Sequence, residues 1–294
     1  MTQYATNPII RERAKNILHR NLGRIIVMNL LQLAFIAVLV PIPFCLYGDA
    51  ALNAMRLTAT YSAAFMKAYP GAVLSTWKPL FCLIGLLIAE LCILLPWLTA
   101  GYRKALIEMA RGVKPSIGTL FCRFRHFFGC IGLDLWITVK LLLWTLPTFG
   151  LLYLIALVGV ITETTPLDTL PAIVVLIPLF ACIIPASFRY SMARHFYADD
   201  PAVGVFGAVR KSKEMMRYRK CQLFRLTFLY ALLSSVISDL SSMISDGLAS
   251  SDALVASILC LVISLAALLL NCYLYLRTEM SQTCFYEAYH IRPE

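Results

Sequence analysis

The sequence predicts an all-α polytopic membrane protein with six transmembrane helices, both termini in the cytoplasm, and amphipathic helices at the membrane interface. Three observations support this fold class. The chain of 294 residues is 60% hydrophobic and only 14% charged. Several of its uncharged runs approach or exceed the roughly 20 residues that a helix needs to cross a hydrocarbon core. Its basic residues gather in alternate connections between those runs, which is the distribution that the positive-inside rule describes.

The first predicted span covers residues 25–46. It follows a basic segment whose apolar residues have the spacing of an amphipathic helix, and it ends near two prolines, Pro41 and Pro43. The connection that follows, up to Lys78, is rich in Ala, Thr and Ser, and we expect a short helix on the outer surface there. The second span covers residues 79–100 and leads into a second basic connection.

The third predicted span, residues 128–161, is longer than one straight crossing requires, and Pro147 is expected to kink it. We favour one long bent helix; the alternative is an interfacial segment that feeds a span from about Leu141. The fourth span covers residues 170–188. Its three prolines recur every seven residues, so they lie near one helical face and leave backbone groups that need other partners: Pro171, Pro178 and Pro185.

The fifth and sixth predicted spans cover residues 223–244 and 253–276, and a short inner tail follows. In this arrangement the segments on the inner side carry 22 of the 26 Lys and Arg residues, and the outer connections carry three, all of them in the first. The positive-inside rule therefore places both termini in the cytoplasm.

The connector Pro185–Arg225 carries nine of the 26 basic residues. Asp200 is a candidate N-cap and Pro201 suits the first helical position, so we expect an amphipathic helix over about 201–219 at the membrane surface. Its apolar residues near helical spacing are Ala202, Val205, Phe206, Val209 and Met216. The basic residues that fill much of the remainder are Arg210, Lys211, Lys213, Arg217, Arg219 and Lys220.

The same connector resembles a bacterial integral membrane family catalogued as domain of unknown function 975. The matching residues are Pro185, Phe188–Ala193, Asp200-Pro201, Ala208, Ser212–Met216 and Leu223-Phe224, together with Arg13–Lys15 and Phe285-Tyr286. Ala186 and Tyr218 depart from the pattern, because glycine is expected at both positions, and residues 141–162 look expanded. The resemblance implies a multi-pass protein of the bacterial inner membrane and supplies no reaction.

Four ionisable residues fall within the predicted spans: Glu90, Asp134, Lys140 and Asp239. Each costs roughly 2.5–3.5 kcal/mol at the centre of a membrane helix, so we expect compensation, for example Asp134 or Glu90 paired with Lys140. Ser235, Asp239 and Ser242 share one face of the fifth span with Asp246, and a second row of serines lies beside them. Such a polar stripe favours a water-filled cavity, although serine also serves plain helix packing.

The remaining chemistry-bearing residues predict no enzyme. His195 and Asp199 are four residues apart, but two ligands are too few for a metal site, and we expect an ordinary surface histidine. The sequence has no HExxH, GxSxG or Walker-type loop, and its ten cysteines form no CxxC pair. Neither a cofactor nor a bound metal is predicted. The basic residues are dispersed between apolar runs, so a nucleic-acid partner is not expected either.

These patterns favour a non-enzymatic integral membrane protein that contacts anionic lipid headgroups, or a cytoplasmic protein partner, through the basic helix. The alternative hypothesis is a transporter or channel for a small solute or ion, with a polar cavity around Glu90 and Asp239.

Overall fold

The computed structural model describes residues 6–39, 41–60, 70–161, 172–249 and 254–290, and these ranges are helical with short connections and no strand. The helices are α1 (Asn7–Leu39), α2 (Pro41–Thr60), α4 (Pro70–Ala110), α5 (Phe127–Ile161), α7 (Ala172–Tyr190), α8 (Ala193–Asp199), α9 (Gly204–Met215), α10 (Lys220–Ala249) and α11 (Leu254–His290). Three short 3₁₀ helices are η1 (Ile117–Phe121), η2 (Phe124–His126) and η3 (Pro201–Val203).

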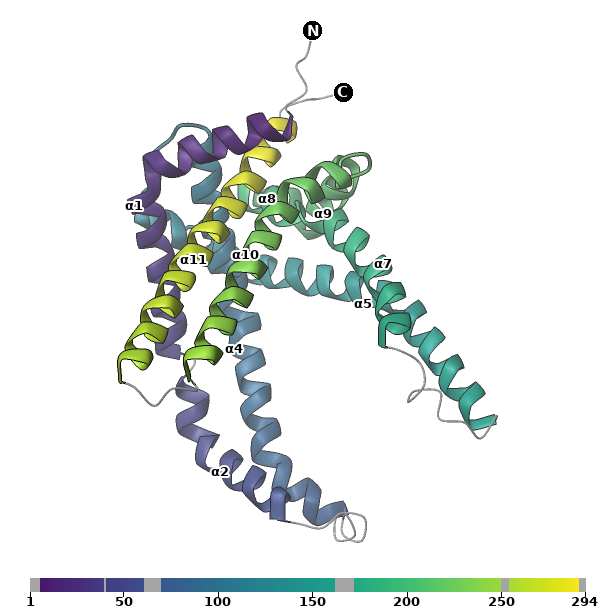
Figure 1. Ribbon diagram of the computed structural model, residues 1–294. Helices are drawn as coiled ribbons and strands as arrows, with labels where there is room; N and C mark the ends of the chain where they lie inside the picture. The colour runs from purple at the N-terminus through teal and green to yellow at the C-terminus, as the bar shows by residue number, and fades with distance from the viewer. Residues whose placement is uncertain (1–5, 40, 61–69, 162–171, 250–253, 291–294) are drawn as a thin grey trace.

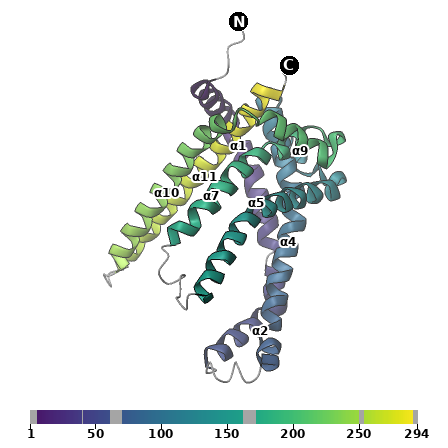
Figure 2. The same cartoon turned by 90° about the vertical axis from the view of Figure 1, so that its right-hand side faces the viewer.

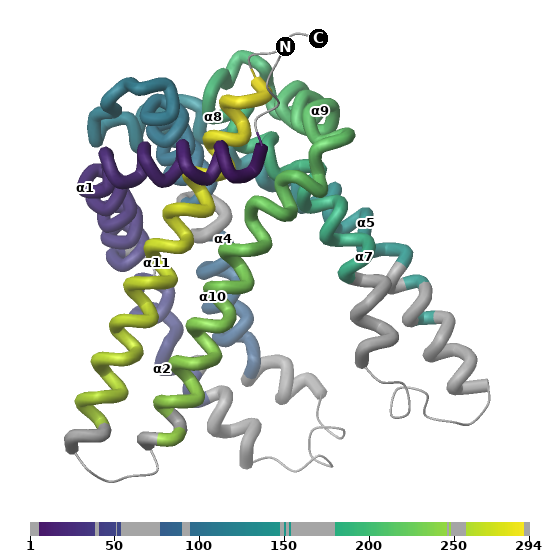
Figure 3. The backbone as a smooth tube through the Cα atoms, turned by 45° about the horizontal axis from the view of Figure 1, so that its top comes forward, coloured from purple at the N-terminus to yellow at the C-terminus, as the bar shows by residue number. Residues whose placement is uncertain are grey.

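Three helix pairs extend from one compact layer and splay apart below it (Figure 1, Figure 2). The pairs are α2 with α4, α5 with α7, and α10 with α11, and each packs along its partner. Both ends of the chain lie at the upper layer, which also holds α8 and α9. The first part of α1 crosses this layer against α11 before the helix turns downward (Figure 3).

Four stretches of the described chain are long and apolar enough to cross a membrane: Asn7–Ala50, Ile117–Pro147, Lys220–Ser245 and Ser257–His290. A shorter apolar helix covers Trp77–Ala89. Length and composition therefore indicate a membrane protein. These four stretches do not establish the six-span count or the side of the membrane on which the termini lie, so both stay predictions.

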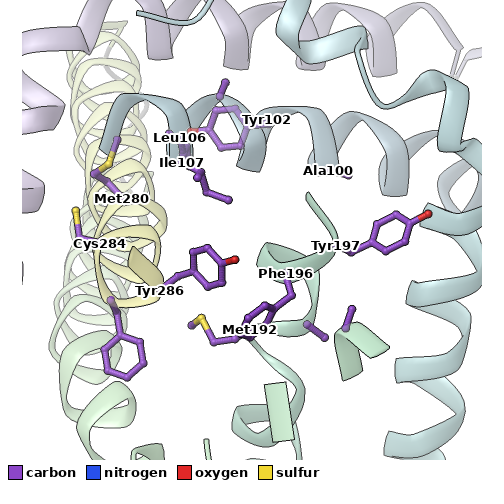
Figure 4. Close-up of a cluster of buried hydrophobic side chains, with 14 of the residues drawn as sticks. Ala100, Tyr102, Leu106, Ile107, Met192, Phe196, Tyr197, Met280, Cys284 and Tyr286 are labelled. Atoms are coloured by element: carbon purple, nitrogen blue, oxygen red, sulfur yellow. The ribbon is translucent and has the colours of Figure 1, made fainter. Parts of the chain in front are cut away.

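The buried core lies in the upper layer and not along the helix pairs. Side chains from α4, α8 and α11 converge there, among them Leu106, Ile107, Met192 and Tyr286, each exposing 1% or less of its surface (Figure 4). The long apolar stretches of the helix pairs are only 6–17% buried. This division is expected if lipid surrounds the pairs, because lipid chains solvate apolar side chains as well as a protein core does.

Two of the predicted spans contain prolines. The span 25–46 is helical up to Leu39 in α1 and from Pro41 in α2, and residue 40 lies outside the described residues. The helix α5 is continuous from Phe127 to Ile161 with Pro147 inside, as favoured from the sequence, and it bends as it descends beside α7 (Figure 1).

The segment after residue 276, expected as a short inner tail, is helical where the structure describes it, and its side of the membrane stays a prediction. The helix α11 continues to His290, and within this extension Phe285 and Tyr286 are fully buried in the core. In the connection after the first predicted span, where a short helix was expected, the described residues are helical up to Thr60 in α2 and from Pro70 in α4, and residues 61–69 lie outside the described ranges.

Candidate functional site

The segment 201–219, expected to form one amphipathic helix, folds as two short helices, η3 and α9, followed by a turn. The carboxylate of Asp200 accepts a hydrogen bond from the backbone N–H of Ala202 at 2.9 Å, which confirms the predicted cap. The capped element is only the 3₁₀ helix η3, because Gly204 has a φ of 71° and redirects the chain into α9. Glycine adopts this left-handed backbone conformation without a steric penalty.

The helix α9 has one buried face. Ala208, Val209 and Ser212 are buried, and the Ser212 hydroxyl donates to the backbone carbonyl of Arg189 at 3.0 Å. Phe206 was expected among the apolar residues of this helix, yet it is 68% exposed. Burial of Ala208, Val209 and Ser212 fixes the rotation of α9 about its own axis, and Phe206 then lies on the exposed side of the helix.

The opposite face and the turn after α9 form what we call the basic-aromatic surface. Its members are all exposed: Phe206, Arg210, Lys211, Lys213, Arg217 and Tyr218. Tyr218 is 86% exposed, and the Arg217 guanidinium lies 5.5 Å from the centre of its ring. Exposed aromatic rings beside basic side chains are typical of membrane-interface surfaces.

Little negative charge offsets this surface. Arg210 forms an ion pair with Glu214 at 3.4 Å, and both side chains are largely exposed, at 81% and 65%. Such a pair contributes about 0.3–0.5 kcal/mol. Within the described ranges, no other carboxylate lies in ion-pair range of Lys211, Lys213 or Arg217.

The other two predicted contact residues have a different environment. Arg219 and Lys220 are half-buried at the start of α10, and the Arg219 guanidinium lies 4.1 Å from the centre of the Tyr289 ring. This cation–π contact joins the connector to the end of α11. Arg219 therefore links the connector to α11 within the upper layer. The other basic residues of the connector's exposed face point to solvent or lipid: Arg210, Lys211, Lys213 and Arg217.

Asp134 and Lys140 lie on α5 but do not pair. Asp134 accepts a hydrogen bond from Nε of Arg194 on α8 at 2.7 Å, and the Lys140 ammonium lies 4.7 Å from the Trp136 ring. That ring contacts Phe206 of α9 edge-on, with 5.0 Å between centroids. The side chain of Glu90 lies outside the described residues, so its partner stays a matter of prediction.

The predicted polar stripe on α10 faces away from α11. Ser235, Asp239 and Ser242 are all exposed, and the Ser242 hydroxyl donates to the backbone carbonyl of Asp239 at 2.9 Å. The neighbouring serine row performs the helix packing. There, Ser234 donates to Asn271 of α11 at 2.7 Å, and Asn271 donates in turn to Ser238 at 3.1 Å.

A polar cluster that the sequence did not reveal joins the ends of three helices. Arg111 follows α4, Asp199 ends α8, and Tyr286, Glu287 and His290 lie in the last turns of α11. Arg111 contacts Glu287 at 2.8 Å, while Tyr286 and His290 approach the Asp199 carboxylate at 3.1 and 3.2 Å. Burial raises the pKa of Asp199, but hydrogen bonds from Arg111 and Tyr286 outweigh it and hold the pKa below its usual value.

His195 lies next to this cluster, on the other side of the Tyr286 contact, and is fully buried. The expectation of a surface histidine is therefore wrong. It stacks on Tyr286 with 5.7 Å between ring centroids. Burial holds the pKa of His195 well below its usual value, and the nearby charges of Arg103 and Arg194 lower it further. The part of the chain that the structure describes contains no group of three His, Cys, Asp or Glu side chains placed to hold a metal ion.

Comparison with known protein families agrees with the resemblance seen in the connector. The family model described as "Protein of unknown function (DUF975)" matches residues 7–288. The chain belongs to this family. No curated protein and no solved structure matches the sequence of this DUF975 protein. The match covers the basic-aromatic surface and the polar cluster up to Glu287, and it ends before Tyr289 and His290.

Proposed function

We propose that this protein is a non-enzymatic integral membrane protein whose basic-aromatic surface binds anionic lipid headgroups at the cytoplasmic face of a bacterial inner membrane. The observation that carries the proposal is the exposure of four basic side chains beside two exposed rings, Phe206 and Tyr218. Each Lys or Arg near an anionic leaflet contributes about 1 kcal/mol. The rings add apolar area at headgroup depth.

The proposal includes six spans with cytoplasmic termini. The basic connections support this orientation, because it places α9 on the leaflet that carries anionic lipid. A cytoplasmic protein partner is the competing occupant of the same surface. Transport through a cavity around Glu90 and Asp239 stays an alternative prediction.

The test uses the purified full chain in a neutral detergent, titrated with micelles that contain phosphatidylglycerol or phosphatidylcholine at several salt concentrations. The test variant replaces Arg210, Lys211, Lys213 and Arg217 with Gln. The control variant makes the same change at four other exposed basic residues, Lys15, Arg20, Lys114 and Arg125. Both variants lose two Arg and two Lys, so their net charges are equal.

We expect the test variant to lose most of the salt-dependent preference for phosphatidylglycerol and the control variant to retain it. Equal losses in the two variants would show that net charge alone attracts the lipid. An unchanged affinity of the test variant, combined with loss of binding to a cytoplasmic protein, would assign the surface to a protein partner instead. Either result would overturn the proposal.

A further inference from the structure

A second polar site lies where α4, α5 and α8 meet, apart from the basic-aromatic surface. A cavity of about 410 Å³ occupies this junction. Its volume falls within the range of small-molecule sites. It is lined by Leu95, Pro96, Thr99, Arg103, Ile131, Asp134, Leu135, Thr138 and Arg194.

The cavity is polar at one end and apolar at the other. Leu95, Thr99 and Arg103 follow one another at intervals of four residues, so they lie along one face of α4. Leu95 and Arg103 are therefore separated by about 12 Å along the helix axis. Arg103 belongs to the segment of α4 that packs into the buried upper layer, and Leu95 lies about two turns closer to the start of the helix.

The apolar end is continuous with the lipid-facing surface of α5. Leu135 lines the cavity and is 63% exposed. A ligand that fits this arrangement has a polar head at the upper layer and an apolar tail that leaves toward the membrane. A small hydrophilic solute would leave Leu95, Ile131 and Leu135 without apolar contacts.

Two guanidinium groups at the polar end have hydrogen-bonding capacity left. Arg194 uses Nε to bond Asp134, and its terminal nitrogens have no bond to a described residue. Arg103 lies 3.8 Å from Glu279, which is too far for a hydrogen bond, and its buried Nε has no partner among the described residues. Guanidinium groups match phosphate geometry because they donate two parallel N–H bonds.

One carboxylate faces the same end. Asp134 accepts one bond from Arg194 through Oδ1, and its side chain is 26% exposed, so acceptor capacity remains for a cation. Glu279 offsets part of the charge of Arg103. The lining thus offers donors for an anion and an acceptor for a cation within a nearly neutral site.

We propose that this cavity binds a phospholipid whose headgroup carries a phosphate and a primary ammonium group. Arg103 and Arg194 hold the phosphate, Asp134 accepts from the ammonium, and the acyl chains leave along Ile131 and Leu135. This site is separate from the basic-aromatic surface, where four exposed basic residues face one exposed carboxylate, Glu214.

The test measures lipid retention by the delipidated full chain, using native mass spectrometry and four probes. The probes are phosphatidylethanolamine, phosphatidylcholine, phosphatidylglycerol and the soluble headgroup glycerophosphoethanolamine. We expect phosphatidylethanolamine to bind about tenfold more tightly than phosphatidylcholine, whose methylated ammonium has no N–H to donate. The soluble headgroup should bind at least about tenfold more weakly than the lipid, because it lacks the apolar chains.

Three test variants and one control separate the contributions of the carboxylate, the guanidinium group and the cavity volume to lipid binding. Asp134→Asn should bring phosphatidylethanolamine to the level of phosphatidylcholine and leave phosphatidylglycerol undiminished. Arg194→Gln should weaken all three phospholipids about tenfold, and Arg125→Gln, at an exposed arginine outside the cavity, should change none of them. Thr138→Phe fills the cavity from an exposed position and should weaken every lipid even if Arg194→Gln fails to fold.

Three results would overturn the proposal. The soluble headgroup binding as tightly as the lipid would indicate a site for a free phosphate compound. A preference for phosphatidylethanolamine over phosphatidylcholine that survives Asp134→Asn would remove the role of the ammonium group. Retention of all lipids by Thr138→Phe would place the binding elsewhere. The four-residue Gln variant of the basic-aromatic surface should leave this retention unchanged, so the two proposals fail separately.

Discussion

Arg111 and Asp199 form a two-pronged ion pair across 88 residues of sequence. The terminal nitrogens of the guanidinium, Nη1 and Nη2, donate to the two carboxylate oxygens at 2.8 and 2.7 Å. The same guanidinium donates from Nε to Glu287 at 3.0 Å. One side chain thereby ties the end of α4 to the ends of α8 and α11, and the first prediction concerns it.

Arg111→Gln should lower the free energy of unfolding by about 1.5–3 kcal/mol, the range for hydrogen bonds to charged groups. Arg111→Lys should recover only part of this, because an ammonium group lacks the planar fork. Thermal unfolding in detergent measures both effects. Arg210→Gln is the matched control, since its ion pair with Glu214 is exposed and its loss should barely move Tm. Equal shifts for the two Gln variants would contradict the prediction.

Acidification should destabilise the protein through His195. The pKa of this buried histidine is lowered in the folded state, while the unfolded chain has the ordinary value near 6.5. The unfolded state therefore binds more protons as the pH falls below about 6.5, and the stability present above that pH is progressively lost. Asp199, with its lowered pKa, adds a further loss only at more acidic pH, below about 4.

The measurement is Tm between pH 8 and pH 5 for the wild type and for His195→Phe, which keeps a buried ring against Tyr286. The variant should show a flatter profile over this range. His126→Phe, at an exposed position, should keep the wild-type slope. A wild-type slope in His195→Phe would assign the acid sensitivity to other groups.

Gly101 allows α4 to approach the carbonyl of Leu120 in η1. A Cβ at residue 101 would overlap that backbone oxygen, and a backbone atom has little freedom to move aside. Gly101→Ala should therefore reduce Tm strongly or prevent folding. Gly23→Ala, where a Cβ meets nothing within 4 Å, should be neutral or slightly stabilising because alanine favours helix. Purified yield and Tm of the two variants compare these outcomes directly.

Thiol labelling should report the orientation of the connector. Cys221 is exposed at the start of α10, whereas Cys130 and Cys284 are buried in the upper layer. In a variant that keeps Cys221 as its one cysteine, a membrane-impermeant maleimide should label inside-out vesicles and leave right-side-out cells unlabelled. Labelling of intact cells would place the basic-aromatic surface outside and reverse the predicted topology.

Local patterns were enough to predict the helical character of the described residues and the Asp200 cap, although the connector forms η3 and α9 in place of one helix over 201–219. Asp200 and Pro201 act within a few residues of their own position, and the long apolar run after Phe127 forms one helix because no other element interrupts it. The family resemblance was also recognisable from one short segment, because most of the matching residues lie close together in the sequence.

The polar cluster and the buried histidine were not predictable in the same way. Arg111, Asp199 and Tyr286 meet only after three distant segments pack, and no spacing in the sequence marks them as partners. His195 was assigned to the surface after a metal site had been set aside for lack of ligands, but α8 inserts it against Tyr286. The direction of Phe206 was missed for a related reason: helical spacing gives relative angles and leaves the absolute rotation of α9 undetermined.

The distribution of the core has a mechanical consequence. The three helix pairs are joined through the upper layer, which holds most of the buried core, whereas the long apolar stretches below it are largely exposed. Each pair is thus free to change its tilt when the bilayer becomes thinner or thicker, at a cost of fractions of a kcal/mol per ångström of mismatch. The layer around Arg111 and Tyr286 does not need to rearrange for this to happen.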